Sequence, residues 1–115
     1  MKILICGDRN WSNVKLIEET IKNYPELRTI IEGGAPGADA IAREVARTLH
    51  IPYIEVRANW RRFGLAAGPK RNKAMLEMKP DLVIAFHNNI IESKGTGNCL
   101  CQAEDKNIRY ALVSE

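Results

Sequence analysis

The stretch IIEGGAPGADAIAREVA, residues 30–46, joins a short apolar run to an amphipathic pattern through three glycines. Apolar residues recur at helical spacing after Gly37, which predicts a helix over residues 37–50. The run before Gly33 is short and apolar, as is typical of a strand buried on both faces, and predicts a strand over residues 28–32. Glycines between a strand and a helix indicate that another group comes very close to the backbone there.

The same alternation of apolar strand and amphipathic helix continues along the chain. Strands are expected over residues 2–6, 28–32, 52–57, 81–87 and 108–113, and helices over residues 13–23, 37–50, 69–78 and 98–106. This order predicts an α/β fold: a single Rossmann-like three-layer domain, residues 1–115, with a five-stranded, mainly parallel sheet and helices on both faces. Ser12 is the expected cap of the first helix, and Pro69 is expected at the first position of the third.

The composition is that of an ordinary globular protein. The chain has 115 residues, 45% hydrophobic and 27% charged, with a net charge of +3, which fits one domain. The apolar start is too short for a signal peptide, and no apolar run is long enough to cross a bilayer. A cytoplasmic protein with reduced thiols is therefore expected. The spacing of Cys6, His87, Cys99 and Cys101 matches no strong metal site, so no metal and no other cofactor is expected.

Ligands of open parallel sheets bind beyond the carboxyl ends of the strands. Residues 7–10, 33–39, 58–72 and 88–98 are expected at that edge. Helix starts expose amides that favour an anion, arginine forks pair with phosphate, and a tryptophan face can stack on a base. The residues expected to bind a phosphorylated, nucleotide-like ligand are Gly7, Arg9, Gly33, Gly34, Gly37, Asp39, Trp60, Gly68, Pro69, Arg71, Asn72, Gly95, Thr96 and Gly97.

Plainer interpretations of the same residues stay open. Glycines at strand–helix turns are often steric spacers, and surface arginines are usually solvated. Trp60 packs under its own loop as readily as it stacks on a base, and Asp39 is better explained by electrostatic support of a helix start than by catalysis. The sequence lacks G-x-G-x-x-G after its first strand and lacks G-x-x-x-x-G-K-[ST], which excludes a dinucleotide fingerprint and a Walker A loop.

Several motifs together resemble a known superfamily. GGAPGAD (33–39), AGPKRN (67–72) and KGTG (94–97), in this order and spacing, resemble the SLOG superfamily, and most closely its YspA/YpsA-related group. The resemblance spans nearly the whole chain and implies a Rossmann-like fold in which a phosphate or ribose approaches the glycines of residues 33–37. Relatives include the LOG phosphoribohydrolases, the DprA single-strand DNA-binding core and domains that sense nucleotide-derived signals. Because relatives often form dimers or larger assemblies, the resemblance also implies a homo-oligomer.

The chain departs from the LOG enzymes, which resemble one another through P-G-G-x-G-T-x-x-E and an arginine in R-K-x-x-M. Arg71 matches that arginine, and Gly95 and Thr96 match the G-T pair. Residues 91–93 read Ile-Glu-Ser instead of P-G-G, and residues 97–99 supply no carboxylate where those enzymes have glutamate. Since an N-glycosidase needs such a carboxylate, the sequence favours a protein that binds a nucleotide or nucleotide-derived signal without catalysis, and its catalytic residues are unknown.

Two alternatives remain. The first is a nucleotide phosphoribohydrolase in which Asp8, Asp39 or Glu92 replaces the missing carboxylate. The second is DprA-like binding of single-stranded nucleic acid. A net charge of only +3 and an aromatic content of 6% disfavour a nucleic-acid partner, because such proteins need a basic groove and stacking platforms. No membrane partner is expected.

Overall fold

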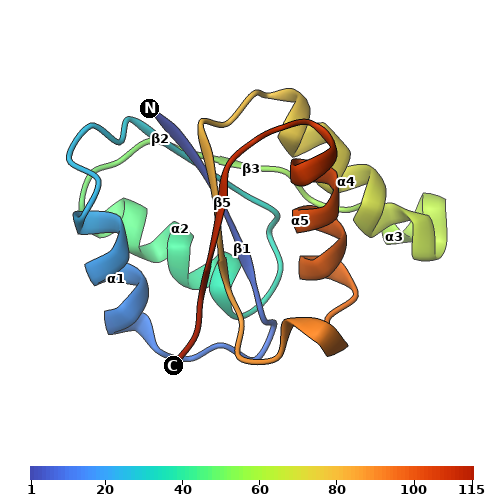
Figure 1. The fold of residues 1–115 in the computed structure, drawn as a ribbon, viewed down its shortest axis with the longest axis horizontal. Helices are drawn as coiled ribbons and strands as arrows, with labels where there is room; N and C mark the ends of the chain where they lie inside the picture. The colour runs from blue at the N-terminus through green and yellow to red at the C-terminus, as the bar shows by residue number, and fades with distance from the viewer.

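The computed structural model describes residues 1–115 and shows a five-stranded sheet between two layers of helices (Figure 1). The strands are β1 (Lys2–Gly7), β2 (Thr29–Glu32), β3 (Tyr53–Glu55), β4 (Leu82–Phe86) and β5 (Tyr110–Val113). The helices are α1 (Val14–Lys22), α2 (Ala38–Thr48), α3 (Trp60–Phe63), α4 (Ala67–Glu77) and α5 (Gly95–Asp105). Short 3₁₀ turns, Gly64–Ala66 and Ile90–Glu92, precede α4 and α5.

The strand order is β3-β2-β1-β4-β5, and every neighbouring pair is parallel. The chain runs outward from β1 through β2 to β3, and then crosses back to β4 on the other side of β1. This reversal is the switch point at which open α/β sheets bind ligands. The prediction of a Rossmann-like three-layer fold is confirmed, and the sheet is entirely rather than mainly parallel. The connection from β2 to α2, residues 33–37, is called the glycine loop below.

Alternate residues of the central strands β1, β2 and β4 enter two separate cores. Ile3 and Ile5 of β1 pack with α1 and α2, whereas Leu4 and Cys6 pack with α4 and α5 on the opposite face. Figure 1 shows the two helix layers on either side of the sheet, with α3 projecting beyond α4. A sheet covered on both faces needs apolar side chains at every position, which explains the uninterrupted apolar runs of the sequence. None of the helices has the length and apolar character that a membrane span requires.

Two predicted helix starts are wrong. Helix α4 begins at Ala67, so Pro69 is its third residue rather than its first. Proline is tolerated there because amides of the first turn have no partner within the helix. Helix α5 begins at Gly95 rather than at residue 98, so Gly95, Thr96 and Gly97 form its first turn. Glycine is unfavourable in the interior of a helix but is accommodated in its first turn. Apolar spacing does not reveal a first turn that is made of such residues.

Two further local expectations are corrected. The cap of α1 is Asn13, whose side chain accepts a hydrogen bond from the amide of Leu16 at 3.0 Å, and not Ser12. The stretch between β3 and α4, expected as a loop, contains α3 and a 3₁₀ turn. Asn59 caps α3 by accepting from the amide of Arg62 at 3.1 Å. The basic and aromatic residues of this stretch therefore lie on a short ordered projection.

Candidate functional site

The glycine loop directs its amides onto carboxylates of the same chain. Asp39 accepts hydrogen bonds at Oδ2 from the amides of Gly33 at 3.1 Å and Ala35 at 3.2 Å. The amide of Gly34 donates to Oε2 of Glu32 at 2.6 Å. Successive amides that converge on anionic oxygens resemble the backbone nests that bind anions in many proteins. Asp39 lies in the first turn of α2 as expected, and its carboxylate also fixes the conformation of the loop.

The closest neighbours of two loop glycines belong to the protein itself. Gly37 has a φ of +76°, and a Cβ atom there would overlap the carbonyl oxygen of Asp8 and lie 2.5 Å from that of Arg9. A Cβ atom at Gly33 would lie 2.7 Å from Nη1 of Arg71. Both glycines therefore act as spacers between packed segments. The resemblance implied a phosphate or ribose at this distance, whereas the chain's own atoms supply these contacts.

Arg71 on α4 is the principal cation beside the glycine loop. Its Nη1 donates to the carbonyl of Gly33 at 2.6 Å, and its Nε donates to Oδ1 of Asn72 at 3.1 Å. It forms no ion pair, and its Nη2 has no hydrogen-bond partner in the protein. The guanidinium is held in place on one side and retains donors and charge on the other. Such a group is suited to bind a phosphate or carboxylate.

Asn72 is buried and connects α4 to α5. Its Nδ2 donates to the carbonyl of Gly95 and to Oδ1 of Asn98, both at 3.2 Å. Gln102 donates to Oδ1 of Asn98 at 2.8 Å and to the carbonyl of Pro69 at 3.1 Å. Hydrogen bonds thus join the glycine loop, α4 and the start of α5. Of the predicted site residues, this network brings together Gly33, Asp39, Pro69, Arg71, Asn72 and Gly95.

The start of α5 is capped by a residue that the sequence analysis missed. Ser93 accepts at Oγ from the amides of Thr96 at 3.1 Å and Gly97 at 3.2 Å. Ser93 lies one residue before the N-cap position, Lys94, and a serine just before a glycine-rich helix start was the available signal. A Cβ atom at Gly95 would meet nothing within 4 Å, and one at Gly97 only the carbonyl of Ile90 at 3.9 Å. Unlike the glycine loop, this turn has open space beside its glycines.

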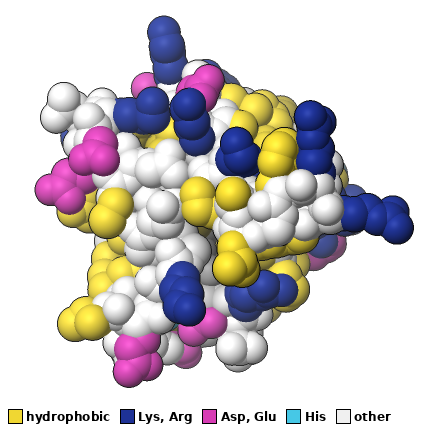
Figure 2. Space-filling view, turned by 90° about the vertical axis from the view of Figure 1, so that its right-hand side faces the viewer, with side chains coloured by type: hydrophobic (Ala, Val, Ile, Leu, Met, Phe, Trp, Pro, Cys, Tyr) yellow, Lys and Arg dark blue, Asp and Glu magenta, His cyan; other side chains and the backbone are white.

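The remaining predicted residues lie outside the hydrogen-bonded network. Trp60 is 51% exposed, and its ring edge lies over Gly68, where a Cβ atom would be 3.2 Å from Cη2. Gly7 is a spacer, since a Cβ atom there would lie 2.7 Å from that of Ala38. Arg9 is exposed and forms no ion pair. Figure 2 looks onto the side that carries α3, α4 and α5, where Lys and Arg side chains lie among exposed hydrophobic ones, with Asp and Glu side chains toward the left and bottom.

Asp8 and His87 meet where β1 and β4 lie side by side. Nε2 of His87 is 3.9 Å from Oδ2 of Asp8. Nδ1 of His87 accepts from the amide of Asn89 at 2.9 Å, which assigns the proton of a neutral ring to Nε2, on the side of Asp8. The sequence offered both residues separately but gave no local signal for their pairing, which depends on the strand order.

Glu32, also missed by the sequence analysis, is a fully buried carboxylate beneath the glycine loop. Burial raises the pKa of Glu32 to about 7, although the hydrogen bond from Gly34 opposes the shift. Burial likewise raises the pKa of Asp39 to about 6, opposed by the bond from Ala35 and the charge of Arg71. Oε1 of Glu32 has no hydrogen-bond partner. An acidic residue at the end of an apolar strand, directly before two glycines, was the available signal.

Replacing Glu32 by glutamine is expected to flatten the dependence of stability on pH. A carboxyl group whose pKa is raised by folding binds more protons in the folded state, so stability falls as pH rises between its unfolded and folded pKa values. For Glu32 that window runs from 4.5 to about 7. Across this pH window, the titration of Glu32 should lower the free energy of unfolding of the wild type by roughly 3 kcal/mol. The Glu32→Gln variant should not show this loss.

The measurement is urea unfolding of both proteins from about pH 4.5 to about pH 8. Glu92→Gln, at an exposed carboxylate, is the matched control and should follow the wild type. Parallel stability curves for the wild type and Glu32→Gln would contradict the assignment of a buried, protonated Glu32.

Several donors at this edge of the sheet have no partner in the protein. These donors are Nη2 of Arg71, the backbone amides of Asp39 and Ala40 in the first turn of α2, and the backbone amide of Gly95 at the start of α5. Two helix N-termini and a guanidinium together favour an anion. No group of three or more His, Cys, Asp or Glu side chains is arranged to hold a metal ion. The unpartnered donors of this edge are therefore suited to an anionic group.

Comparison with known proteins places this arrangement in a family. Residues 1–63, more than half of the chain, match the YspA, cpYpsA-related SLOG family. The Gene 61 protein of Mycobacterium phage D29 is 29% identical over 116 residues, which cover 93% of this chain and 91% of that protein. The X-ray structure of DNA processing protein A (DprA) from Streptococcus pneumoniae matches with a TM-score of 0.79 and 18% identity, over 96% of this chain.

The chain spans about half of the DprA chain, 49% of its length. At 18% identity, this likeness shows a shared fold and nothing more. The family match includes β1, the glycine loop and α2, which carry the first part of the site described above. The chain belongs to the YspA, cpYpsA-related SLOG family.

Proposed function

We propose that this chain binds a phosphorylated, nucleotide-derived ligand at the carboxyl edge of its sheet and senses or sequesters that ligand without breaking it. The observation that carries the proposal is Arg71: a guanidinium fastened to the glycine loop, with no ion pair and with Nη2 free. Residues 1–115 act in this proposal as one ligand-binding domain. A phosphate bound to Arg71 would gain charge-assisted hydrogen bonds at a position already fixed by Gly33 and Asn72.

The surrounding groups support a ligand larger than phosphate alone. The unpartnered amides of α2 and α5 add donors for phosphate oxygens. Open space beside Gly95 and Gly97 leaves room for a sugar or base next to α5. Trp60 is half exposed and offers part of its ring for stacking. Nothing in these contacts distinguishes one base from another, so the proposed ligand class is a nucleoside phosphate, linear or cyclic.

The carboxylates near the site argue against hydrolysis. Asp39 and Glu32 are buried and hold amides of the glycine loop, so neither is directed at a ligand. The position where the LOG enzymes have glutamate is occupied here by Cys99, which is also buried. Asp8, which is accessible and faces His87, and Glu92, which is exposed just before α5, are the remaining carboxylates that could act as an acid or base. Neither carboxylate is needed by a protein that binds its ligand without breaking it.

Incubation with nucleoside monophosphates is expected to release no free base at an enzymatic rate. A placed acid–base group contributes roughly 10²–10⁴-fold to such a reaction, and the residue pattern that supplies it in the resembling enzymes is absent. The measurement is chromatography of adenine, guanine, cytosine and uracil over hours, with ligand binding followed in parallel by thermal shift. Binding without base release supports the proposal. Base release that is lost in Asp8→Asn or Arg71→Ala would contradict binding without catalysis and support the phosphoribohydrolase alternative.

A second candidate, single-stranded nucleic-acid binding, rests on the segment around α3. Trp60 and Phe63 are exposed beside Arg61 and Arg62, and Lys70 lies 4.9 Å from the centre of the Phe63 ring. Basic side chains interleaved with aromatic rings form stacking platforms for bases. The DprA neighbour, by its name a DNA-processing protein, shares the fold. This candidate is second because the hydrogen-bonded network converges on Arg71 and not on α3.

Fluorescence anisotropy with a labelled oligothymidylate separates the two candidates. If the chain is a nucleotide binder, the oligothymidylate should bind weakly and in a salt-sensitive way, through the exposed cations of α3. Arg71→Ala should then leave the affinity for the oligothymidylate unchanged. Tight binding that is lost in Trp60→Ala and Phe63→Ala would promote the nucleic-acid function. Arg61→Ala on α3 and Arg28→Ala away from it each remove one exposed positive charge and serve as a matched charge control.

A further inference from the structure

The two edges of the sheet are built differently. Edge strand β3 has only three residues, and Pro52 precedes it. Its Glu55 forms ion pairs with Arg43 at 2.7 Å and Arg57 at 3.3 Å, and its Tyr53 hydroxyl accepts from Arg47. Short length, proline and charge are the devices that keep an edge strand from pairing with another chain. The β3 edge is therefore protected.

The opposite edge, β5, is one residue longer and lacks the other two devices. Its residues Tyr110–Val113 read Tyr-Ala-Leu-Val, with no proline and no charge. The amides of Val83 and His87 donate to the carbonyls of Arg109 and Val113, respectively. The backbone groups of Arg109 and Val113 therefore face β4. Backbone groups alternate along a strand, which turns the amides and carbonyls of Tyr110 and Leu112 toward solvent. In Figure 1, β5 runs in front of the other strands between the two helix layers.

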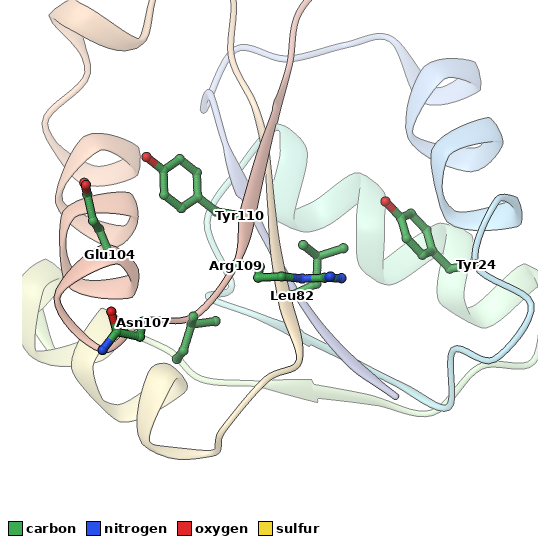
Figure 3. A pocket seen from close by; sticks show the side chains of 7 residues that line it. Tyr24, Leu82, Glu104, Asn107, Arg109 and Tyr110 are labelled. Carbon is green, nitrogen blue, oxygen red and sulfur yellow. The ribbon is translucent and has the colours of Figure 1, made fainter.

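The side chains of this edge are apolar and accessible. Tyr110 is 44% and Leu112 is 45% exposed, although both lie in a regular strand. A surface hollow of about 550 Å³ lies beside the amino end of β5. Figure 3 shows it between α5 and the α1 side of the sheet, with Tyr110 on one side of the strand and Arg109 and Tyr24 on the other. This hollow is at the end of the sheet opposite the candidate ligand site, so the two surfaces are separate.

The sequence of the edge is complementary to itself when two copies run antiparallel. With Leu112 opposite Leu112 of a second copy, Tyr110 lies opposite the partner's Ser114, and Arg109 lies opposite the partner's Glu115. Arg109 has no ion pair within the chain, and Glu115 accepts only from the neutral amides of Asn13 and Asn88. Two opposite charges that have no ion pair within one chain thus meet twice, once on each side of a two-fold axis.

We propose that β5 is a homodimer interface, at which residues 109–115 of two copies pair antiparallel about Leu112 and extend the sheet across both chains. The outward amides and carbonyls of Tyr110 and Leu112 then gain the partners that they lack in one chain. The partner's last β5 residues lie beside the hollow at Arg109. The occupant of this edge is a second copy of the chain because the complementary charges belong to one and the same strand. The interface is independent of the proposed ligand.

Light scattering after gel filtration, over a range of protein concentrations, is the first test. The wild type is expected to form dimers, and Leu112→Lys is expected to be monomeric because two ammonium groups would face each other at the axis. Ile54→Lys, at an exposed residue of β3, is the matched control and should remain dimeric. A wild type that is monomeric at every concentration, or a Leu112→Lys variant that still dimerises, would overturn the proposal.

A charge-exchange experiment tests the register. Arg109→Glu and Glu115→Arg each place like charges opposite each other, and each should raise the dimer dissociation constant by about tenfold. A mixture of the two variants restores both opposite-charge pairs, so heterodimers should form with nearly wild-type affinity. Both residues are exposed, and unchanged circular dichroism confirms that the variants fold. A mixture that dimerises no better than the separate variants would contradict the antiparallel pairing.

Discussion

Replacing Gly37 by valine is expected to unfold the protein or to leave it barely stable. Gly37 has a φ of +76°, a conformation that costs a β-branched residue about 1–3 kcal/mol. Its Cβ atom would also overlap the backbone of Asp8 and Arg9, which cannot move away as the end of a flexible side chain could. Moving the β1–α1 loop would break the hydrogen bond from the amide of Ala38 to the carbonyl of Asp8. The total should exceed about 4 kcal/mol, a large part of the stability of a domain this size.

Urea unfolding, followed by circular dichroism, measures this effect. Gly64→Val is the matched control, because Gly64 also has a positive φ, +54°, but a Cβ atom there would meet nothing within 4 Å. The free energy of unfolding of Gly64→Val should fall only by the cost of the positive φ, about 1–3 kcal/mol. If Gly37→Val unfolds at the same urea concentration as Gly64→Val, the close approach of the β1–α1 loop is not a constraint on the fold.

Replacing Arg71 by alanine is expected to weaken nucleotide binding by about 10- to 150-fold, the loss of about 1.5–3 kcal/mol typical of a hydrogen bond to a charged group. The variant also loses the bond to the carbonyl of Gly33, so its stability must be measured beside its affinity. Calorimetric titration with adenosine monophosphate and with a cyclic dinucleotide gives the affinity. Lys73→Ala removes an exposed cation from the same helix and should bind as the wild type does. Equal affinities for the wild type and Arg71→Ala would remove Arg71 from the site.

The fold could be predicted because its signals are local. Each β1 residue from Ile3 to Cys6 is buried on one face or the other, so the strand reads as an unbroken apolar run. The glycine loop carried the strongest sign of a βα turn, and the positive φ of Gly34 and Gly37 explains why glycine is needed there. Starts of helices were less predictable. Apolar periodicity begins only where a helix packs against the sheet, and the first turns of α4 and α5 lie before that point.

The internal chemistry of the site could be predicted only in part. The sequence indicated which residues reach the carboxyl edge, and hydrogen bonds join Gly33, Arg71, Asn72 and Gly95 there. It did not indicate that the amides of the glycine loop are taken by Asp39 and Glu32, because carboxylate orientation depends on the packing of α2 against β2. Contacts between residues distant in the chain require the strand order, which local patterns do not contain.

Mass spectrometry of molecules released from natively purified wild type and Arg71→Ala, prepared side by side, tests ligand binding at the carboxyl edge most directly. Denaturing the wild type should release a phosphorylated, nucleotide-derived molecule in an amount comparable to the protein, with its glycosidic bond intact. The Arg71→Ala preparation should release little of it, since the guanidinium beside Gly33 supplies the charge-assisted contact. Release of no nucleotide from either preparation, or of the same amount from both, would contradict a nucleotide site built on Arg71.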